Sequence, residues 1–465
     1  MALIRPGLSV ERPAPTAAAD GSGPSRAAQA YAEVPPPVGV ALRAMRLEAL
    51  LGDPHDPANP YGQPALWAAG RGSLPEPPAD LPAVTVPRPG GARPAADQLA
   101  RILRPVFRRD LALGHAWGIR PLLDASDPAA ALLGPAALIA ATGGVLRTVT
   151  RIVDGLSRHE PGVGQWRPVL AATFADLLAC ESLTAVALRS VPWTQGAAGG
   201  ACGLVSGDAV GPMLDGSSGL VAAVGYVVPQ LVGELLDDLE LVLNECGFRA
   251  DSPERRTLAK LAGDRAQAQV DWTAAAAWQA RVVRGLAGLT DPARHGEHPE
   301  LRALFRLADT SPVDVGTGQA DCHGAVAATL TGATARLAGD GDSATAALAR
   351  VGRRLVTEQR ALRVACGPTA SHDPADPVAR ALADRQALLL LAASVLGVRE
   401  AAAEGWVRFL GGPDWALLAL SRITDRLGAP RPGAAPDPQA AVWAELAERS
   451  GHGVDCDVYA TQLLW

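Results

Sequence analysis

Lysine is almost absent from this sequence, and its scarcity limits the chemistry open to the chain. Lys260 is the one lysine among 465 residues, so arginine supplies nearly all of the positive charge. A Schiff-base mechanism, or one with a lysine nucleophile, therefore has a single candidate residue. Lys260 lies in the ordinary helical context Arg255-Arg-Thr-Leu-Ala-Lys260, and we expect it on a solvated helix face.

The chain also lacks paired cysteines. Its six cysteines are scattered, with no Cys-x-x-Cys pair and no Cys/His cluster at zinc spacing. We therefore expect reduced, unreactive thiols and no metal site. The neighbours Cys322 and His323 do not by themselves give the geometry of a nucleophile and its base, and we interpret them as structural.

Long apolar runs and an excess of positive charge are missing as well. No stretch reaches about 18 uninterrupted apolar residues, so the sequence predicts no membrane-spanning segment. Charged residues and a proline, Arg5, Pro6, Glu11 and Arg12, interrupt the first residues, which argues against a secretory signal. The net charge of −6 at pH 7 gives no electrostatic case for binding nucleic acid or an anionic membrane. We expect a cytoplasmic protein that binds neither.

Helical periodicity dominates what is present. Aromatic residues make up 4% of the chain and alternating β-branched runs are short, so strand signals are weak. Apolar residues recur at spacings of three and four over most of the chain. The expected helices are 38–51, 95–119, 132–156, 168–191, 220–246, 253–289, 324–338, 343–366, 376–403, 406–427 and 438–449. The sequence thus predicts a mainly α fold with very little strand.

The same pattern divides the chain into four parts. Residues 1–33 are rich in Pro, Ala, Gly and Ser, and we expect a disordered tail there. An N-terminal helical region (34–125), a central helical bundle (126–310) and a C-terminal helical domain (311–465) follow. Residues 194–219 are glycine-rich and longer than a helix pair needs, so we expect a loop that is either mobile or folded over something.

Two motifs lie on either side of a short alanine- and proline-rich segment. Leu103-Arg-Pro-Val-Phe-Arg-Arg-Asp-Leu-Ala-Leu-Gly-His-Ala-Trp-Gly118 precedes it, and Phe174-Ala-Asp-Leu-Leu-Ala-Cys-Glu-Ser-Leu183 follows it. With the stretches 50–62, 226–243, 380–396 and 406–427, they resemble the helical parts of large bacterial acyl-CoA dehydrogenase-like proteins of specialised metabolism. The resemblance implies an acyl-CoA dehydrogenase-like helical bundle with an additional C-terminal helical domain.

The strand-rich domain that separates these motifs in the family is missing here. Only residues 124–135 stand in its place, and in the family that domain supplies much of the flavin and acyl-thioester pocket. The turn Ser157-Arg-His-Glu-Pro-Gly162 also lacks the aromatic-glycine step that helps hold FAD in the family. We therefore predict that the protein uses no cofactor, and we keep FAD as the alternative.

The nearest match to the family's catalytic glutamate is Asp271, in Asp271-Trp-Thr273, and Trp272 beside it is a candidate substrate contact. A carboxylate among apolar residues has its pKa raised by desolvation, which suits a general base or acid. The alternative is a carboxylate that caps a helix N-terminus or pairs with Arg265.

Five further polar residues are candidates for the site. Glu181, if it faces inward, needs a partner such as Arg189 or His115, and the alternative is an exposed glutamate. Arg108 and Arg109 offer planar guanidinium groups for a carboxylate, phosphate or sulfate, and the alternative is a solvated face with local ion pairs. We group Arg189 with them as anion-binding, and His115 is a candidate proton shuttle.

These features favour a flavin-independent enzyme, or the large subunit of one, in natural-product or antibiotic biosynthesis. Proton transfer combined with anion binding suits a lyase-type elimination or a ring closure on a small metabolite or a carrier-bound substrate, because neither needs a redox cofactor. Two alternatives stay open: a non-catalytic partner that docks another protein or a carrier, and an FAD-dependent acyl-CoA or acyl-carrier dehydrogenase. We expect a partner subunit or a homodimer.

Overall fold

The structure is a computed structural model that describes residues 36–68, 74–85, 94–121, 128–191, 218–290, 299–309, 322–337, 342–367, 370–405, 407–430 and 436–465. Over these ranges helix follows helix without a strand, and one isolated β-bridge joins Val454 and Gln462. The mainly α prediction is therefore confirmed. The expected tail at 1–33, most of the expected loop at 194–219 and the boundaries at residues 33, 125 and 310 lie outside the described residues, so the division into domains stays a prediction.

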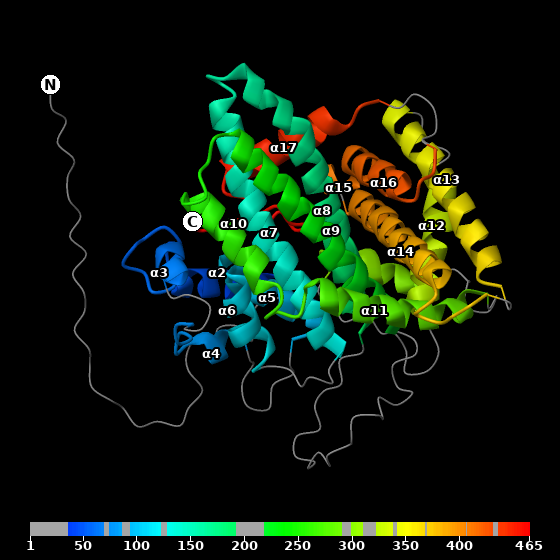
Figure 1. Cartoon of the computed structure of the whole chain (residues 1–465), viewed down its shortest axis with the longest axis horizontal. Coiled ribbons are helices and arrows are strands. Elements are labelled where there is room, and N and C mark those ends of the chain that lie inside the picture. Colours follow the sequence, from blue (N-terminus) through cyan, green and yellow to red (C-terminus); the bar gives the residue numbers. More distant parts are fainter. Residues whose placement is uncertain are drawn as a thin grey trace, which may run out of the picture.

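The helices form a layered bundle in which the N-terminal helices lie at one end and helices α12, α13 and α16 at the other (Figure 1). In chain order they are α2 (Pro36–Leu51), α3 (Gln63–Ala68), α4 (Leu81–Thr85), α5 (Ala96–Arg109), α6 (Leu111–Leu113), the π-helix η2 (Gly114–Ile119), α7 (Pro128–Leu156), the 3-10 helix η3 (Pro161–Trp166), α8 (Arg167–Ser190), α9 (Ser218–Glu245), α10 (Pro253–Asp264), α11 (Trp272–Gly285), the 3-10 helices η5 (Leu286–Thr290) and η7 (Pro299–Phe305), α12 (Cys322–Leu337), α13 (Ser343–Ala365), α14 (Pro377–Glu404), α15 (Arg408–Gly411), α16 (Asp414–Arg426) and α17 (Gln439–Gly451).

Helix α8 forms the centre of the bundle. Its residues from Leu170 to Ser190 are all buried, because α7, α9, α14, α16 and α17 pack around it. A helix with apolar residues on every side needs such complete cover. One continuous hydrophobic cluster runs from Ala96 to Val458, and a smaller cluster joins α2, α3 and α4 to α5.

Four helical segments are long and apolar enough to cross a membrane: Ala129–Leu156, Pro161–Ser190, Gly219–Glu245 and Pro377–Glu404. The sequence criterion of an uninterrupted apolar run did not detect these four segments, because isolated polar residues interrupt each of them. Inside the protein, 78%, 94%, 78% and 78% of their most apolar windows are buried. Packing of the helices on one another thus accounts for their apolar character, while the cytoplasmic location stays a prediction.

The prediction of a single helix at 253–289 is wrong, because the chain forms two separate helices there, α10 and α11. Gln269 adopts a φ of 56° in the break, a left-handed backbone conformation that helices do not contain. Asp271 then caps α11, and its side chain accepts a hydrogen bond from the backbone N–H of Ala274 at 3.1 Å. Capping requires such a non-helical residue before the first turn.

The proline-rich loop after α2 is held in a fixed shape by side-chain hydrogen bonds to its own carbonyls. The Asn59 amide donates to the carbonyls of Leu51 (2.8 Å) and Asp53 (2.7 Å). Arg109 donates to the carbonyls of Gly52 (2.5 Å) and Tyr61 (2.9 Å). The loop therefore presents a defined surface toward α5 and α7.

Gly62 closes this loop where a side chain has no room. A Cβ there would lie 2.7 Å from the Asp56 carbonyl oxygen and 3.1 Å from that of Asn59, both backbone atoms. We expect Gly62→Ala to lower the free energy of unfolding by about 1–3 kcal/mol, because the loop must shift. Urea denaturation checks this. Gly155→Ala is the matched control, since a Cβ there meets nothing within 4 Å, and equal effects of the two changes would contradict the prediction.

Candidate functional site

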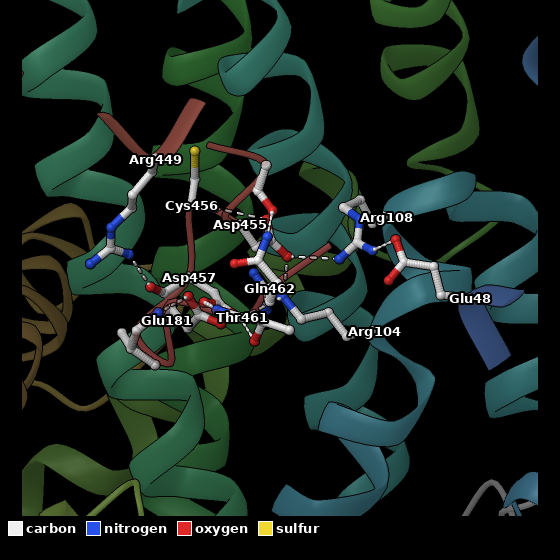
Figure 2. A network of polar contacts seen from close by, with 12 residues as sticks. Glu48, Arg104, Arg108, Glu181, Arg449, Asp455, Cys456, Asp457, Thr461 and Gln462 are labelled. Atoms are coloured by element: carbon white, nitrogen blue, oxygen red, sulfur yellow. Dashed lines mark hydrogen bonds and ion pairs between the residues drawn. The ribbon is translucent and has the colours of Figure 1, made fainter. Parts of the chain in front are cut away.

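The segment after α17, residues 452–465, turns back into the helical bundle. Gly453, with a φ of 66°, makes the turn, and the N–H of Val454 donates to the carbonyl of Arg449 at 2.9 Å. Asp455 and Asp457 follow, and both are 0% exposed. Figure 2 shows these residues between α5, α7 and α8. A buried segment that carries two acids requires cationic partners.

Arg104 of α5 is the main partner. Its Nε donates to Asp455 Oδ2 at 2.9 Å and lies 3.2 Å from Asp457 Oδ2, while its Nη1 donates to Glu181 Oε1 at 2.5 Å (Figure 2). The N–H of Val458 donates to the second oxygen of Glu181 at 3.0 Å. One guanidinium thus joins α5, α8 and the 452–465 segment.

Arg108, one helical turn further along α5, extends this set of contacts to α2. Its Nη1 donates to Asp455 Oδ2 at 2.9 Å and its Nη2 to Glu48 Oε1 at 2.6 Å. The six residues Glu48, Arg104, Arg108, Glu181, Asp455 and Asp457 are called the Arg104 network below. Its members come from three helices and one irregular segment, so their meeting depends on the complete fold.

Two carboxyl groups of the Arg104 network, Glu181 and Asp455, have pKa values shifted in opposite directions. Burial raises the pKa of Glu181 to about 7, with Asp457 and Asp455 adding to the effect and Arg104 opposing it. Burial also disfavours the charge on Asp455, but Arg104, Arg108 and Arg147 hold its pKa well below its usual range. Of these two carboxyl groups, Glu181 is therefore the one whose pKa lies near neutral pH.

A cavity of about 360 Å³ lies beside the network and is called the arginine cavity below. It is formed by α2, the loop after it, α3, α5, α7, α9, α10 and Trp465. Its charged lining residues are Glu48, Arg108, Arg109, Arg147, Arg151 and Glu254, and its aromatic ones are Trp67 and Trp465. The volume and the mixture of apolar surface with a few polar groups are typical of small-molecule sites.

Arg147 of α7 lines this cavity and does not use all of its hydrogen-bond donors. Its Nε and Nη1 are buried without a hydrogen-bond partner among the described residues. Burial lowers the pKa of Arg147; Asp455 opposes this, and Arg108 and Arg151 add to it. Burial and Arg108 likewise lower the pKa of Arg109 to about 10. Crowded, desolvated guanidinium groups of this kind are stabilised by an anion.

The structure brings together only some of the residues proposed from the sequence. Glu181 faces inward, but the expected partners, Arg189 and His115, are wrong, because Arg104 pairs with it. Arg108 belongs to both the Arg104 network and the arginine cavity. Arg109 lines the cavity while holding loop carbonyls, so neither arginine lies on a solvated face with local pairs.

The other proposed residues lie elsewhere. Arg189 pairs with Asp97 at 3.1 Å and donates to the carbonyls of Ala303 and Asp309. Burial and Arg120 lower the pKa of His115, which lies on η2. Trp272 is 69% exposed beside the capping residue Asp271. Their proposed catalytic and binding roles stay predictions.

Lys260 corrects one expectation. Its Nζ lies 2.5 Å from Asp110 and 2.6 Å from Asp264, and its side chain is 20% exposed rather than solvated. Both acids favour the ammonium form, and the pKa of Lys260 is raised although burial opposes this. A charged, doubly paired lysine serves as a structural link between α6 and α10 and is unsuited to Schiff-base chemistry.

Sequence reasoning missed Glu48, Arg104, Arg147, Asp455 and Asp457. One signal was available, because Arg147 and Arg151 are four residues apart on one helix, and like charges at that spacing repel. The partners of Arg104 lie too far along the chain for any local pattern to reveal. Among the described residues, no group of three or more His, Cys, Asp or Glu is placed to hold a metal ion.

Comparisons with protein-family models, with curated proteins and with solved structures find no match to this chain. Any functional inference therefore depends on the geometry of the site and on the family resemblance expected from the sequence motifs.

Proposed function

We propose that this protein is an enzyme, or the large subunit of one, that binds an anionic small molecule in the arginine cavity and acts on it by proton transfer. The observation that carries the proposal is the buried guanidinium of Arg147, which lines a cavity of ligand size and has donors without a partner among the described residues. The substrate is a small metabolite or a carrier-bound group, and the setting is cytoplasmic specialised metabolism. A second subunit or a second copy of the chain is the expected partner.

Glu48 is a buried carboxylate on the cavity wall and the group that we assign to proton transfer. It is buried, it belongs to α2, and Arg108 fixes its position through a 2.6 Å contact. In an elimination, such a carboxylate removes a proton from carbon, the C–H electron pair becomes the new double bond, and the leaving group departs with its own pair. Arg147 would hold the anionic group of the substrate during this step.

The arrangement of the helices supports the flavin-independent form of the proposal. η2 ends at Ile119 and α7 begins at Pro128. The connection between them is therefore far shorter than the flavin-contacting domain of the family that the motifs resemble. We propose that the lineage is acyl-CoA dehydrogenase-like and that the arginine cavity has taken over ligand binding.

An absorbance spectrum tests this against the dehydrogenase alternative. The full chain is incubated with excess FAD, desalted and scanned from about 300 to 550 nm, where oxidised flavin absorbs. We expect no flavin band to remain with the protein. A retained band at one flavin per chain would contradict the flavin-independent form and make hydride transfer the leading reaction.

A further inference from the structure

The charge of the arginine cavity indicates which anion it accepts. Four arginines face two glutamates on its wall, Glu48 and Glu254, which leaves an excess of two positive charges. Asp455 lies behind this wall, where Arg104, which does not line the cavity, supplies a counter-charge to it at 2.9 Å. A ligand with two negative charges matches the wall better than a ligand with one.

Two of the four arginines, Arg147 and Arg151, lie close together on one helix of the cavity wall. Arg147 and Arg151 are one turn apart on α7, and Arg151 adds to the effects that lower the pKa of Arg147. Arg108 and Arg109 are occupied by Glu48 and by loop carbonyls, so they contribute charge while their hydrogen-bonding groups are largely used. The buried donors without a partner among the described residues are therefore those of Arg147, and Arg151 lies one turn away on α7.

Apart from His55, Gln63, Thr148 and Thr257, the rest of the lining is apolar. Val145 and Val149 come from α7, and the indole rings of Trp67 and Trp465 come from α3 and the 452–465 segment. A free inorganic anion would leave this surface in contact with water. A ligand with an anionic head and an apolar or aromatic body would cover it, which adds affinity in proportion to the apolar area buried.

We infer that the ligand of the arginine cavity is a phosphate monoester, with its phosphate on Arg147 and Arg151 and an apolar or aromatic body against Trp67 and Trp465. This inference rests on the proposed function and narrows its substrate class. Phosphate monoesters carry close to two charges at pH 7, because their second pKa is near 6. A carboxylate or a sulfate ester of the same shape carries one.

Calorimetric titration at pH 7.5 with phenyl phosphate, phenyl sulfate, benzoate and inorganic phosphate tests the inference on the full chain. We expect phenyl phosphate to bind at least about tenfold more tightly than each of the other three. Arg147→Gln should weaken phenyl phosphate by about 10- to 100-fold, as expected for charge-assisted hydrogen bonds. Arg158→Gln is the matched control, since Arg158 follows the same helix, is exposed, and forms one local ion pair with Asp154.

The outcomes distinguish the phosphate inference from the proposed function on which it rests. Tight binding of phenyl phosphate that is lost in Arg147→Gln and kept in Arg158→Gln supports both. Equal or tighter binding of benzoate or phenyl sulfate, still dependent on Arg147, overturns the phosphate inference and leaves the proposed function standing. Absence of binding by all four probes, or equal affinity of the two variants, overturns both. A thermal melt of Arg147→Gln separates lost binding from lost folding, because the buried Asp455 keeps its contacts with Arg104 and Arg108 in this variant.

Discussion

Arg104→Met is expected to lower the free energy of unfolding by about 3–5 kcal/mol, the cost of leaving buried charges without their partner. Glu181, Asp455 and Asp457 all lie within 3.2 Å of the Arg104 guanidinium. Arg108 contacts only Asp455 among these three acids, so it does not replace the lost cation. The 452–465 segment should then loosen, because both of its aspartates are fully buried.

Two measurements check this expectation. Chemical denaturation gives the loss of stability, and hydrogen exchange at residues 452–465 reports whether the loss begins in that segment. Arg158→Met is the control, since Arg158 is 70% exposed and should change stability by less than about 0.5 kcal/mol. A deficit of similar size in both variants, or unchanged exchange in the segment, would show that the Arg104 network does not hold the segment in place.

The second large effect is a dependence of stability on pH that comes from Glu181. In an unfolded chain a glutamate titrates near pH 4.3, whereas burial raises the pKa of Glu181 to about 7 in the fold. Between these two values the folded state binds more protons than the unfolded state. Its free energy of unfolding should therefore fall as the pH rises from about 4.5 to 7, by on the order of 2–3 kcal/mol from this residue.

Glu181→Gln should remove this slope, because glutamine does not titrate. The comparison is between slopes rather than absolute stabilities, since glutamine also changes one hydrogen bond of the site. Asp455 acts in a different window: its depressed pKa adds stability that is lost only as the pH falls below the usual range of an aspartate. If the variant and the wild-type protein show the same slope between pH 5 and about 7.5, Glu181 is not the titrating group.

The helical fold could be predicted because each long helix carries its own apolar period. Helix α8 is predicted within a residue or two of its ends, since its pattern and the flanking turns are local. The break between α10 and α11 was missed, because Gln269 takes a left-handed conformation that its residue type does not signal.

The site was harder to predict because its contacts are remote in sequence. The sequence left an inward-facing and an exposed Glu181 both open, and the structure shows the side chain inward, with its partner Arg104 77 residues away. Asp271 has an equally apolar neighbourhood, yet it caps a helix, since the chain breaks just before it. The arginine cavity depends on how a proline-rich loop and Trp465 pack against α7, and no local pattern contains that information.

Synthesis from the N-terminus determines when Arg104 can first contact Asp455. Arg104 emerges early, whereas Asp455 follows 351 residues later. At roughly 5–20 residues per second, α5 waits on the order of twenty seconds to a minute for Asp455. During that time Arg108 can pair with Glu48 and Arg104 with Glu181. We expect the packing around α5 to be completed only after residue 457 leaves the exit tunnel, and an early-binding chaperone or subunit would have that interval in which to act.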